Sequence, residues 1–198
     1  MVCQMTMMPN FTTIVNSETL EDTEILRKFS LSSTKEEAFR ALLEKYQERV
    51  YWHIRKLVIT HEDADDLTQE TFIKAWHNLN GFEGKSQLYT WLYRIATNHS
   101  LNFLNKKKKR FFLSIHDVNK ELANKLDESE LISGDEIQIK LQKAILKLPE
   151  KQRLVFNMKY FEDMSYQDIS EVLDTSVGAL KASYHHAVKK IEHILTNS

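Results

Sequence analysis

The chain has one cysteine, two prolines and four glycines among its 198 residues. A lone Cys3 cannot form a disulfide within the chain, so a disulfide scaffold is excluded. A single cysteine is consistent with a protein of a reducing compartment. The shortage of proline and glycine leaves few helix breakers, while Leu, Glu, Lys, Gln and Ala occur throughout and favour helices. The hydrophobic fraction of 42% is sufficient for packed cores. From the few breakers and the many helix-favouring residues, we expect an all-α fold with almost no sheet.

Long apolar runs are also missing. No stretch approaches the roughly 18 apolar residues that a membrane span requires. Residues 1–17 contain no Lys or Arg and no unbroken apolar segment, which is atypical of a signal peptide or an anchor. We therefore expect a cytoplasmic protein without membrane insertion, in which residues 1–33 form an N-terminal tail.

The chain lacks the short motifs of common enzymes and metal sites. It has no H-E-x-x-H, C-x-x-C, G-x-x-x-x-G-K-[ST] or G-x-G-x-x-G pattern. The adjacent His185 and His186 point about 100° apart on a helix, and no Cys or carboxylate completes a metal-binding set. Asp65, Asp66 and Glu70 lie on one expected helix, but they are more typical of a charged contact or solvent face than of an acid–base pair. We expect no catalytic residue, no metal and no cofactor.

The net charge of −1 hides a polarised distribution. Residues 1–84 carry 9 basic and 14 acidic side chains, whereas residues 85–110 carry 7 basic and none acidic. Residues 111–139 hold 2 basic and 7 acidic side chains, and residues 140–198 hold 9 basic and 7 acidic ones. One short segment, which ends in the basic run 106–110, therefore holds the basic excess.

Apolar spacing predicts a first helical domain over residues 34–110. A capping-box pattern at Ser33 and Glu36 begins a helix expected over about 35–59. A second helix is expected to begin after Thr60 and to end at Asn80 and Gly81, and a third runs from about Leu88 into the basic run. Residues 111–136 lose clear periodicity and become acidic, which predicts a linker.

A second helical domain is predicted over residues 137–198. A short helix to Leu148 precedes one over about 149–160, with Pro149 in its first turn. Ser165 then caps a brief helix, and Ser176 caps a last helix that runs to about Leu195. This order gives a helix, a tight turn and a helix.

The last helix has one apolar stripe and one polar face. The stripe comprises Val177, Leu180, Tyr184, Ala187, Ile191 and Ile194. The polar face carries lysines and histidines, and a helix of this polarity after a tight turn suits a DNA major groove. A solvated face in a helical bundle explains the same pattern, because short turns between helices are common in all-helical proteins.

Aromatic and amide side chains stand next to the basic run. Tyr89, Arg94, Asn98 and Asn102 follow the loop 82–86, and such a mixture can hold unstacked bases and the backbone of a single strand. Trp91 is expected to pack in the core instead. A run of lysines is by itself a poor specificity signal, since it also suits a solvated helix end.

Taken together, these segments resemble the extracytoplasmic-function (ECF) subfamily of bacterial RNA polymerase sigma factors. Residues 62–76, EDADDLTQETFIKAW, resemble that family's region 2.2, and residues 90–98, TWLYRIATN, its regions 2.3 and 2.4. Residues 148–153, LPEKQR, open what resembles region 4, and residues 164–170, MSYQDIS, enter its helix-turn-helix. The similarity covers roughly 35–110 and 137–195.

The resemblance implies a transcription initiation factor without a catalytic site. Its first domain would dock on core RNA polymerase and recognise and melt the minus-10 element, and its second would read the minus-35 element. The polymerase-binding residues implied are Asp65, Asp66, Gln69, Phe72 and Trp76, although Trp76 also suits a core position. The minus-10 residues implied are Asn80, Lys85, Ser86, Tyr89, Arg94, Asn98, Asn102 and Lys106. The minus-35 residues implied are Ser176, Lys181, Ser183, His185, His186 and Lys189.

The chain departs from the family pattern in the last helix, where Ser183 and His186 stand in place of arginines found in many relatives. Silencing by a separate anti-sigma factor is a property of the family that the sequence itself does not show. Two other functions fit the pattern. One is a regulator that binds duplex DNA without polymerase, and the other is a helical adaptor with no DNA role.

Overall fold

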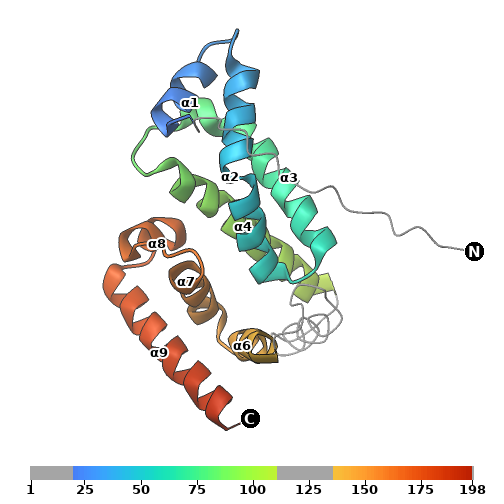
Figure 1. Ribbon diagram of the computed structural model, residues 1–198, viewed down its shortest axis with the longest axis vertical. Coiled ribbons are helices and arrows are strands. Elements are labelled where there is room, and N and C mark those ends of the chain that lie inside the picture. The colour runs from blue at the N-terminus through green and yellow to red at the C-terminus, as the bar shows by residue number, and fades with distance from the viewer. Residues whose placement is uncertain (1–19, 111–135, 198) are drawn as a thin grey trace, which may run out of the picture.

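The computed structural model describes residues 20–110 and 136–197, and all regular elements in these ranges are helices. The first half contains α1 (Asp22–Phe29), α2 (Lys35–Val58), α3 (His61–Asn78), the 3₁₀ turn η1 (Leu79–Gly81) and α4 (Leu88–Arg110). The second half contains α6 (Glu136–Leu146), α7 (Glu150–Tyr160), α8 (Tyr166–Leu173) and α9 (Val177–Thr196). Figure 1 shows the first half as a bundle of long helices with the second half beneath it. The all-α, two-domain prediction is confirmed, while the predicted linker 111–136 lies almost entirely outside the described residues.

Within the range predicted as a tail, the structure contains the helix α1, which the sequence pattern did not predict. Its Ile25 and Phe29 are buried. Asp22 holds the helix in place from its first turn, because its carboxylate accepts hydrogen bonds from Lys45 Nζ at 2.8 Å and from the Tyr46 hydroxyl at 2.7 Å. An eight-residue helix is shorter than the window in which helical periodicity becomes visible, so its signal in the sequence was weak.

Two of the predicted helix starts need correction. Thr34, not Ser33, is the residue before α2, and its hydroxyl donates to the carbonyl of Lys28 at 2.8 Å instead of capping the helix. Pro149 precedes α7 rather than lying in its first turn. By contrast, Ser165 and Ser176 accept hydrogen bonds from the backbone N–H groups of Asp168 and Ala179, so both predicted caps of the helix-turn-helix are confirmed.

A tight turn joins α8 to α9. Asp174 ends α8 in the left-handed region with φ 48°, which Asp tolerates better than most residues. In α9 the predicted stripe faces inward: Leu180, Ala187 and Ile191 are buried, and the other stripe residues are half-buried. They pack on α6 and α7, so the opposite face of α9 is left to solvent.

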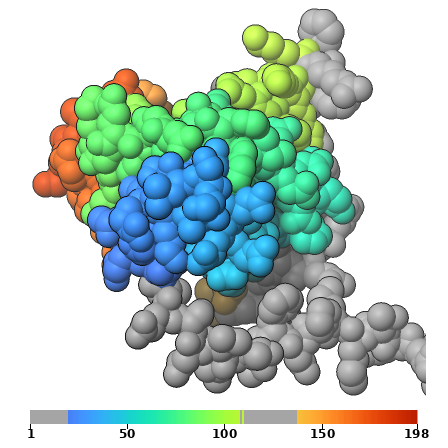
Figure 2. Space-filling model, turned by 90° about the horizontal axis from the view of Figure 1, so that it is seen from above, coloured from blue at the N-terminus to red at the C-terminus, as the bar shows by residue number. Residues whose placement is uncertain are grey.

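The core of the first half continues into the second. α4 packs against α8, and α2 packs against α7. Buried side chains of α7 and α8, such as Met158 and Ile169, join the same apolar cluster as Leu42 and Leu92 of the first half. From above, the start of α4 and the loop before it, in green, lie against the orange-red second half (Figure 2).

His53 of α2 is a buried histidine that should make the fold sensitive to acid. Its Nε2 is hydrogen-bonded to the Thr97 hydroxyl at 2.9 Å, and its ring lies 4.6 Å from that of Tyr93. Burial lowers the pKa of His53 to about 4. Since the neutral form is favoured in the fold, stability is full above the unfolded value of about 6.5 and is lost as pH falls toward 4.

We expect this protonation to remove about 3 kcal/mol of folding free energy by pH 4. Urea unfolding at pH 7 and pH 4 measures it. His53→Gln keeps a hydrogen-bonding group toward Thr97 but cannot be protonated, so it should lose much less stability between the two pH values. Equal losses in the wild type and the variant would contradict this assignment.

Candidate nucleic-acid interface

A long groove runs between α2 and α3. It consists of two adjoining hollows of about 840 and 540 Å³ that share Leu43, Gln47, Thr68 and Gln69. Its remaining lining is Phe39, Glu44, Glu48, Tyr51, Trp52, His61, Asp65, Phe72, Ile73, Trp76 and His77. The groove therefore combines an apolar floor with three carboxylates, and it suits a partner with basic and apolar side chains.

Four of the five residues predicted to bind polymerase line this groove: Asp65, Gln69, Phe72 and Trp76. Asp66 does not. It lines a separate hollow of about 260 Å³ between α3 and α4, together with Glu70, His99 and Lys106. Neighbouring residues on a helix point about 100° apart, so the adjacent aspartates serve different surfaces.

The two predicted aromatic residues are also part of the core. Phe72 is buried. The ring of Trp76 is half-buried and packs edge to face on Phe29 at 5.3 Å and on Phe39 at 5.0 Å. Trp76 therefore packs against the core, as its alternative assignment predicts, and its half-buried ring also lines the groove.

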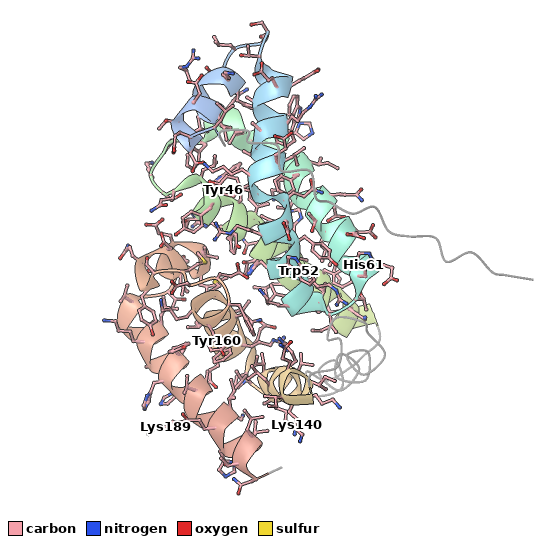
Figure 3. The ribbon with its side chains drawn as sticks, viewed as in Figure 1. Tyr46, Trp52, His61, Lys140, Tyr160 and Lys189 are labelled. Carbon is pink, nitrogen blue, oxygen red and sulfur yellow. The ribbon has the colours of Figure 1, made fainter. Side chains whose placement is uncertain are left out.

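Among the groove residues that the sequence did not predict, two are large apolar side chains that are exposed. Ile73 is 60% exposed and Trp52 is 41% exposed, both unusually high for large apolar side chains. Figure 3 shows Trp52 and His61 at the same end of the α2–α3 pair. The Tyr51 hydroxyl is hydrogen-bonded to His61 Nδ1 at 2.7 Å, and His61 Nε2 lies 3.4 Å from Asp65 Oδ2. The sequence did contain a signal for Ile73, because this apolar residue lies on the otherwise polar face of the 62–76 motif.

Four predicted minus-10 residues form one stripe on α4. Arg94, Asn98, Asn102 and Lys106 recur every four residues and are all exposed. The loop before α4 holds the exposed Asn80 and Lys85 and the half-exposed Ser86. Trp91 of α4 is half-buried, with its ring 5.5 Å from that of Phe82 in this loop. Stripe and loop together offer amides, positive charge and partly accessible rings.

Tyr89 does not join this stripe. Its ring lies 6.2 Å from that of Tyr93 and 5.9 Å from the guanidinium of Arg49. Burial, followed by the hydrogen bond of its hydroxyl to Asp168 of α8, raises the pKa of Tyr89 to about 12. The predicted strand-binding tyrosine is thus turned toward the second half of the molecule.

The exposed face of α9 gathers the predicted minus-35 residues. Lys181, His185, His186 and Lys189 are exposed, Ser183 is half-buried, and the exposed Ser176 caps the helix. Figure 3 shows Lys189 on the side of α9 that faces away from the other helices. Lys181 Nζ lies 5.8 Å from the centre of the Tyr166 ring on α8. The helix-turn-helix therefore presents one polar, basic face.

Neither a metal centre nor a membrane span is found in the two described ranges. No group of three or more His, Cys, Asp or Glu side chains there is placed to hold an ion. None of the helices placed by the structure is both long and apolar enough to cross a bilayer.

In the residues that the structure describes, fold and surface define a helical protein of the DNA-binding class, with a helix-turn-helix domain in its C-terminal part. The family model "Sigma-70 region 2" matches residues 42–110, and "Sigma-70, region 4" matches residues 138–191. The ECF RNA polymerase sigma factor SigW of Bacillus subtilis is 30% identical over 158 residues, which cover 76% of this chain and 84% of SigW. The RNA polymerase sigma-H factor of Pseudomonas aeruginosa is 34% identical over 168 residues, which cover 80% and 86%.

The fold is also similar to two solved structures. CnrH in complex with the cytosolic domain of CnrY has a TM-score of 0.64 and 24% identity, covering 89% of this chain and 99% of that one. The sigma factor RpoE in complex with the anti-sigma factor NepR from Bartonella quintana has a TM-score of 0.63 and 22% identity, covering 80% and 96%.

The protein belongs to the extracytoplasmic-function family of RNA polymerase sigma factors. It directs core RNA polymerase to promoters and initiates transcription by recognising the minus-35 and minus-10 elements and helping to melt the DNA. Sigma factors confer promoter specificity on polymerase.

Proposed function

We propose a division of labour for this sigma factor, in which residues 34–110 bind polymerase and open the minus-10 element while residues 137–198 read the minus-35 element. The acidic stretch 111–136 serves as the linker, and residues 1–33 take no part in promoter contacts. The factor has no catalytic site and acts in the cytoplasm, on the nucleoid when it is part of holoenzyme. The groove between α2 and α3 carries this proposal, because all of its lining residues except Phe39 lie within the region 2 match.

Docking uses the α2–α3 groove. Its carboxylates attract a basic surface, and its apolar floor, with Ile73 exposed, buries apolar side chains of the partner. In this family the corresponding motif docks on the clamp helices of polymerase, and Asp66 at the next hollow completes the contact. Run-off transcription with purified core polymerase tests the function as a whole.

In that assay, transcripts from a cognate promoter should require this factor, and neither core polymerase nor the factor alone should produce them. A regulator would instead bind duplex DNA in the absence of polymerase, and a helical adaptor would bind no DNA at all. Either result, without factor-dependent transcripts, would overturn the proposal.

Melting uses the loop before α4 and the stripe along α4. Lys85 reaches into solvent and pairs with Glu83, so it is free to exchange this partner for a phosphate. We expect Lys85→Ala with Ser86→Ala to lower permanganate reactivity at the minus-10 element about tenfold while polymerase binding changes little. Glu83→Ala in the same loop is the matched control, and it should not reduce melting. Full melting by the double variant would contradict this role.

Duplex readout uses the exposed face of α9. Lys181, Lys189 and Lys190 serve as phosphate contacts, and we expect neutralisation of each to weaken binding on every sequence and to lower the salt slope by about one unit. Ser183 and His185 reach base edges, where each good contact contributes roughly 1–3 kcal/mol of discrimination. Ser176 and His186 lie on either side of Ser183 and His185 in the sequence.

The measurement is selection of holoenzyme on a randomised upstream element, followed by sequencing. His185→Ala should change the preferred sequence, whereas Lys189→Ala should preserve the preference and lower affinity uniformly. An unchanged preference with a uniform loss of affinity would move His185 into the phosphate-contact group.

An anti-sigma factor is a further proposed partner. Both solved structures named above are complexes of a similar fold with a regulatory partner, NepR or CnrY. Pull-down with the tagged factor from its own cells, followed by a run-off assay with the captured protein, tests for inhibition.

A further inference from the structure

The last helix is longer than a DNA major groove is wide. α9 contains 20 residues, so it is about 30 Å long at 1.5 Å per residue, whereas the major groove is about 12 Å wide. It forms the outer edge of the second half of the molecule (Figure 1). The residues at the start of a recognition helix contact base edges. The turns of α9 that follow the proposed base reader His185 therefore lie where the helix leaves the groove, next to the phosphate backbone.

These later turns carry a compact group of four side chains, the α9 cluster: His186, Lys189, Lys190 and His193. The two lysines are adjacent, and each histidine lies three or four residues from both of them, so the four occupy neighbouring positions on one helical face. All four are exposed, and in the described part of the chain none of their side chains makes a hydrogen bond or an ion pair. Figure 3 shows Lys189 directed away from the other helices. The cluster is therefore open to a partner.

The chain itself places little negative charge around the cluster. Glu192 is the one acidic residue of α9, and it forms no ion pair with Lys189, which lies one turn before it. His185 is a further titratable neighbour, with its ring 6.1 Å from that of His186. The described side chains of α6, residues 137–146, include no carboxylate. The titratable groups of α7 and α8 that act on α9 do so at Tyr184, on the opposite flank: Lys159, Tyr160 and Tyr166.

The chemistry of the cluster suits a phosphate backbone. Duplex DNA carries one phosphate charge per about 1.7 Å of its axis, and α9 rises about 10 Å between His186 and His193. Lysine supplies a permanent charge, whereas histidine supplies one only as imidazolium, which ordinary histidines form near pH 6.5. A neutral imidazole can still donate one hydrogen bond, but it releases no counterion from the DNA. The positive charge of the cluster therefore increases as pH falls.

We propose that the α9 cluster is a phosphate clamp beside the minus-35 element, and that its two histidines couple promoter binding to pH. This inference rests on the proposed readout of duplex DNA by α9. Because a phosphate attracts the imidazolium and not the neutral ring, binding to DNA takes up protons. Affinity for the promoter is therefore highest below about pH 6.5, and it falls as pH rises through the range in which the bound histidines lose their protons.

The test measures the affinity of holoenzyme for a promoter fragment at pH 6 and pH 8, each at several salt concentrations. His53 is neutral in the fold at both values, since burial lowers its pKa to about 4. For the wild type, we expect affinity about tenfold higher at pH 6 than at pH 8. The salt slope should be about one unit steeper at pH 6, because protonated histidines displace additional counterions.

Two double variants fix the charge of the cluster. His186→Gln with His193→Gln keeps hydrogen-bonding side chains that never carry a charge. It should bind about tenfold more weakly than the wild type at pH 6 and equally well at pH 8. His186→Lys with His193→Lys is charged at both pH values, and it should bind like the wild type at pH 6 and about tenfold more tightly at pH 8. Since the proteins are compared at the same pH, effects of pH on polymerase itself cancel.

A promoter fragment that keeps the minus-10 element but lacks duplex at the minus-35 element identifies the partner of the cluster. On this fragment the wild type and both double variants should bind alike at each pH. If they differ there as well, the cluster contacts polymerase and the phosphate clamp is overturned. A ratio of wild-type to glutamine-variant affinity that is the same at pH 6 and pH 8 also overturns it. If none of the three holoenzymes transcribes from the promoter, the proposed function fails instead, so the two failures are distinguishable.

Discussion

Trp76→Ala is expected to destabilise the first half of the molecule by about 3 kcal/mol, because it removes the centre of an aromatic cluster. The Trp76 ring joins Phe29 of α1 to Phe39 of α2, and Lys35 Nζ lies 4.7 Å from its centre. Its loss should loosen α1 first, since Phe29 is one of only two buried residues in that helix.

Ile73→Ala is the matched comparison in the same groove. Its side chain is largely exposed, so we expect a change in stability within about 0.5 kcal/mol but weaker binding to core polymerase. Urea unfolding and a polymerase-binding titration separate the two quantities. A Trp76→Ala variant as stable as the wild type, or an Ile73→Ala variant that binds normally, would show that the groove residues have been assigned the wrong roles.

Helical periodicity predicted the long elements well, for a clear physical reason. In α2, α3 and α9 the apolar face is long enough to repeat several times, and their observed bounds lie within two residues of the predicted ones. The eight residues of α1 repeat that pattern only twice. What fixes α1 is its contact with Trp76 and Tyr46, and contacts distant in sequence leave no periodic signal.

Site residues were predicted less completely than helices, because motifs give residue types without their directions. Asp65 and Asp66 are adjacent in the motif and yet line different hollows. Tyr89 lies next to the basic stripe in sequence, but its side chain points about 140° away from that of Arg94 on an ideal helix. Its partner Asp168 belongs to the other half of the molecule, and no local pattern links the two.

The sequence did not predict the interface between the first half (α1–α4) and the second half (α6–α9) of the molecule. Lys56 and Glu162 are 106 positions apart, and each suits a solvated surface when considered alone. Only the packing of α8 on α4 and α7 on α2 brings them together. The sequence therefore predicts the bounds and faces of a single helix better than it predicts contacts between domains, because those contacts depend on tertiary packing.

Charge reversal of both aspartates on α3 is expected to weaken binding to core polymerase about a hundredfold or more. Asp65 lines the α2–α3 groove beside Glu44 and Glu48, and a basic partner that meets lysines there gains repulsion in place of attraction. Asp66 is exposed at the next hollow. Neither side chain is buried, so the variant should keep its helical content and its unfolding midpoint.

The single variants then map the docking face along one helix. Asp65→Lys and Asp66→Lys should each weaken binding about tenfold, which is about 1.4 kcal/mol. Glu70→Lys introduces the same charge on the α4 side of α3, where Glu70 Oε2 lies 3.6 Å from His99 Nδ1, and it should have the smallest effect. Affinities for core polymerase measured at two salt concentrations give a second test. A loss of affinity that comes from charge repulsion at a solvent-exposed site decreases at higher salt, because salt screens the repulsion. If Asp65→Lys binds polymerase normally while Glu70→Lys weakens binding, the polymerase contacts the α3–α4 hollow and the α2–α3 groove is not the docking site.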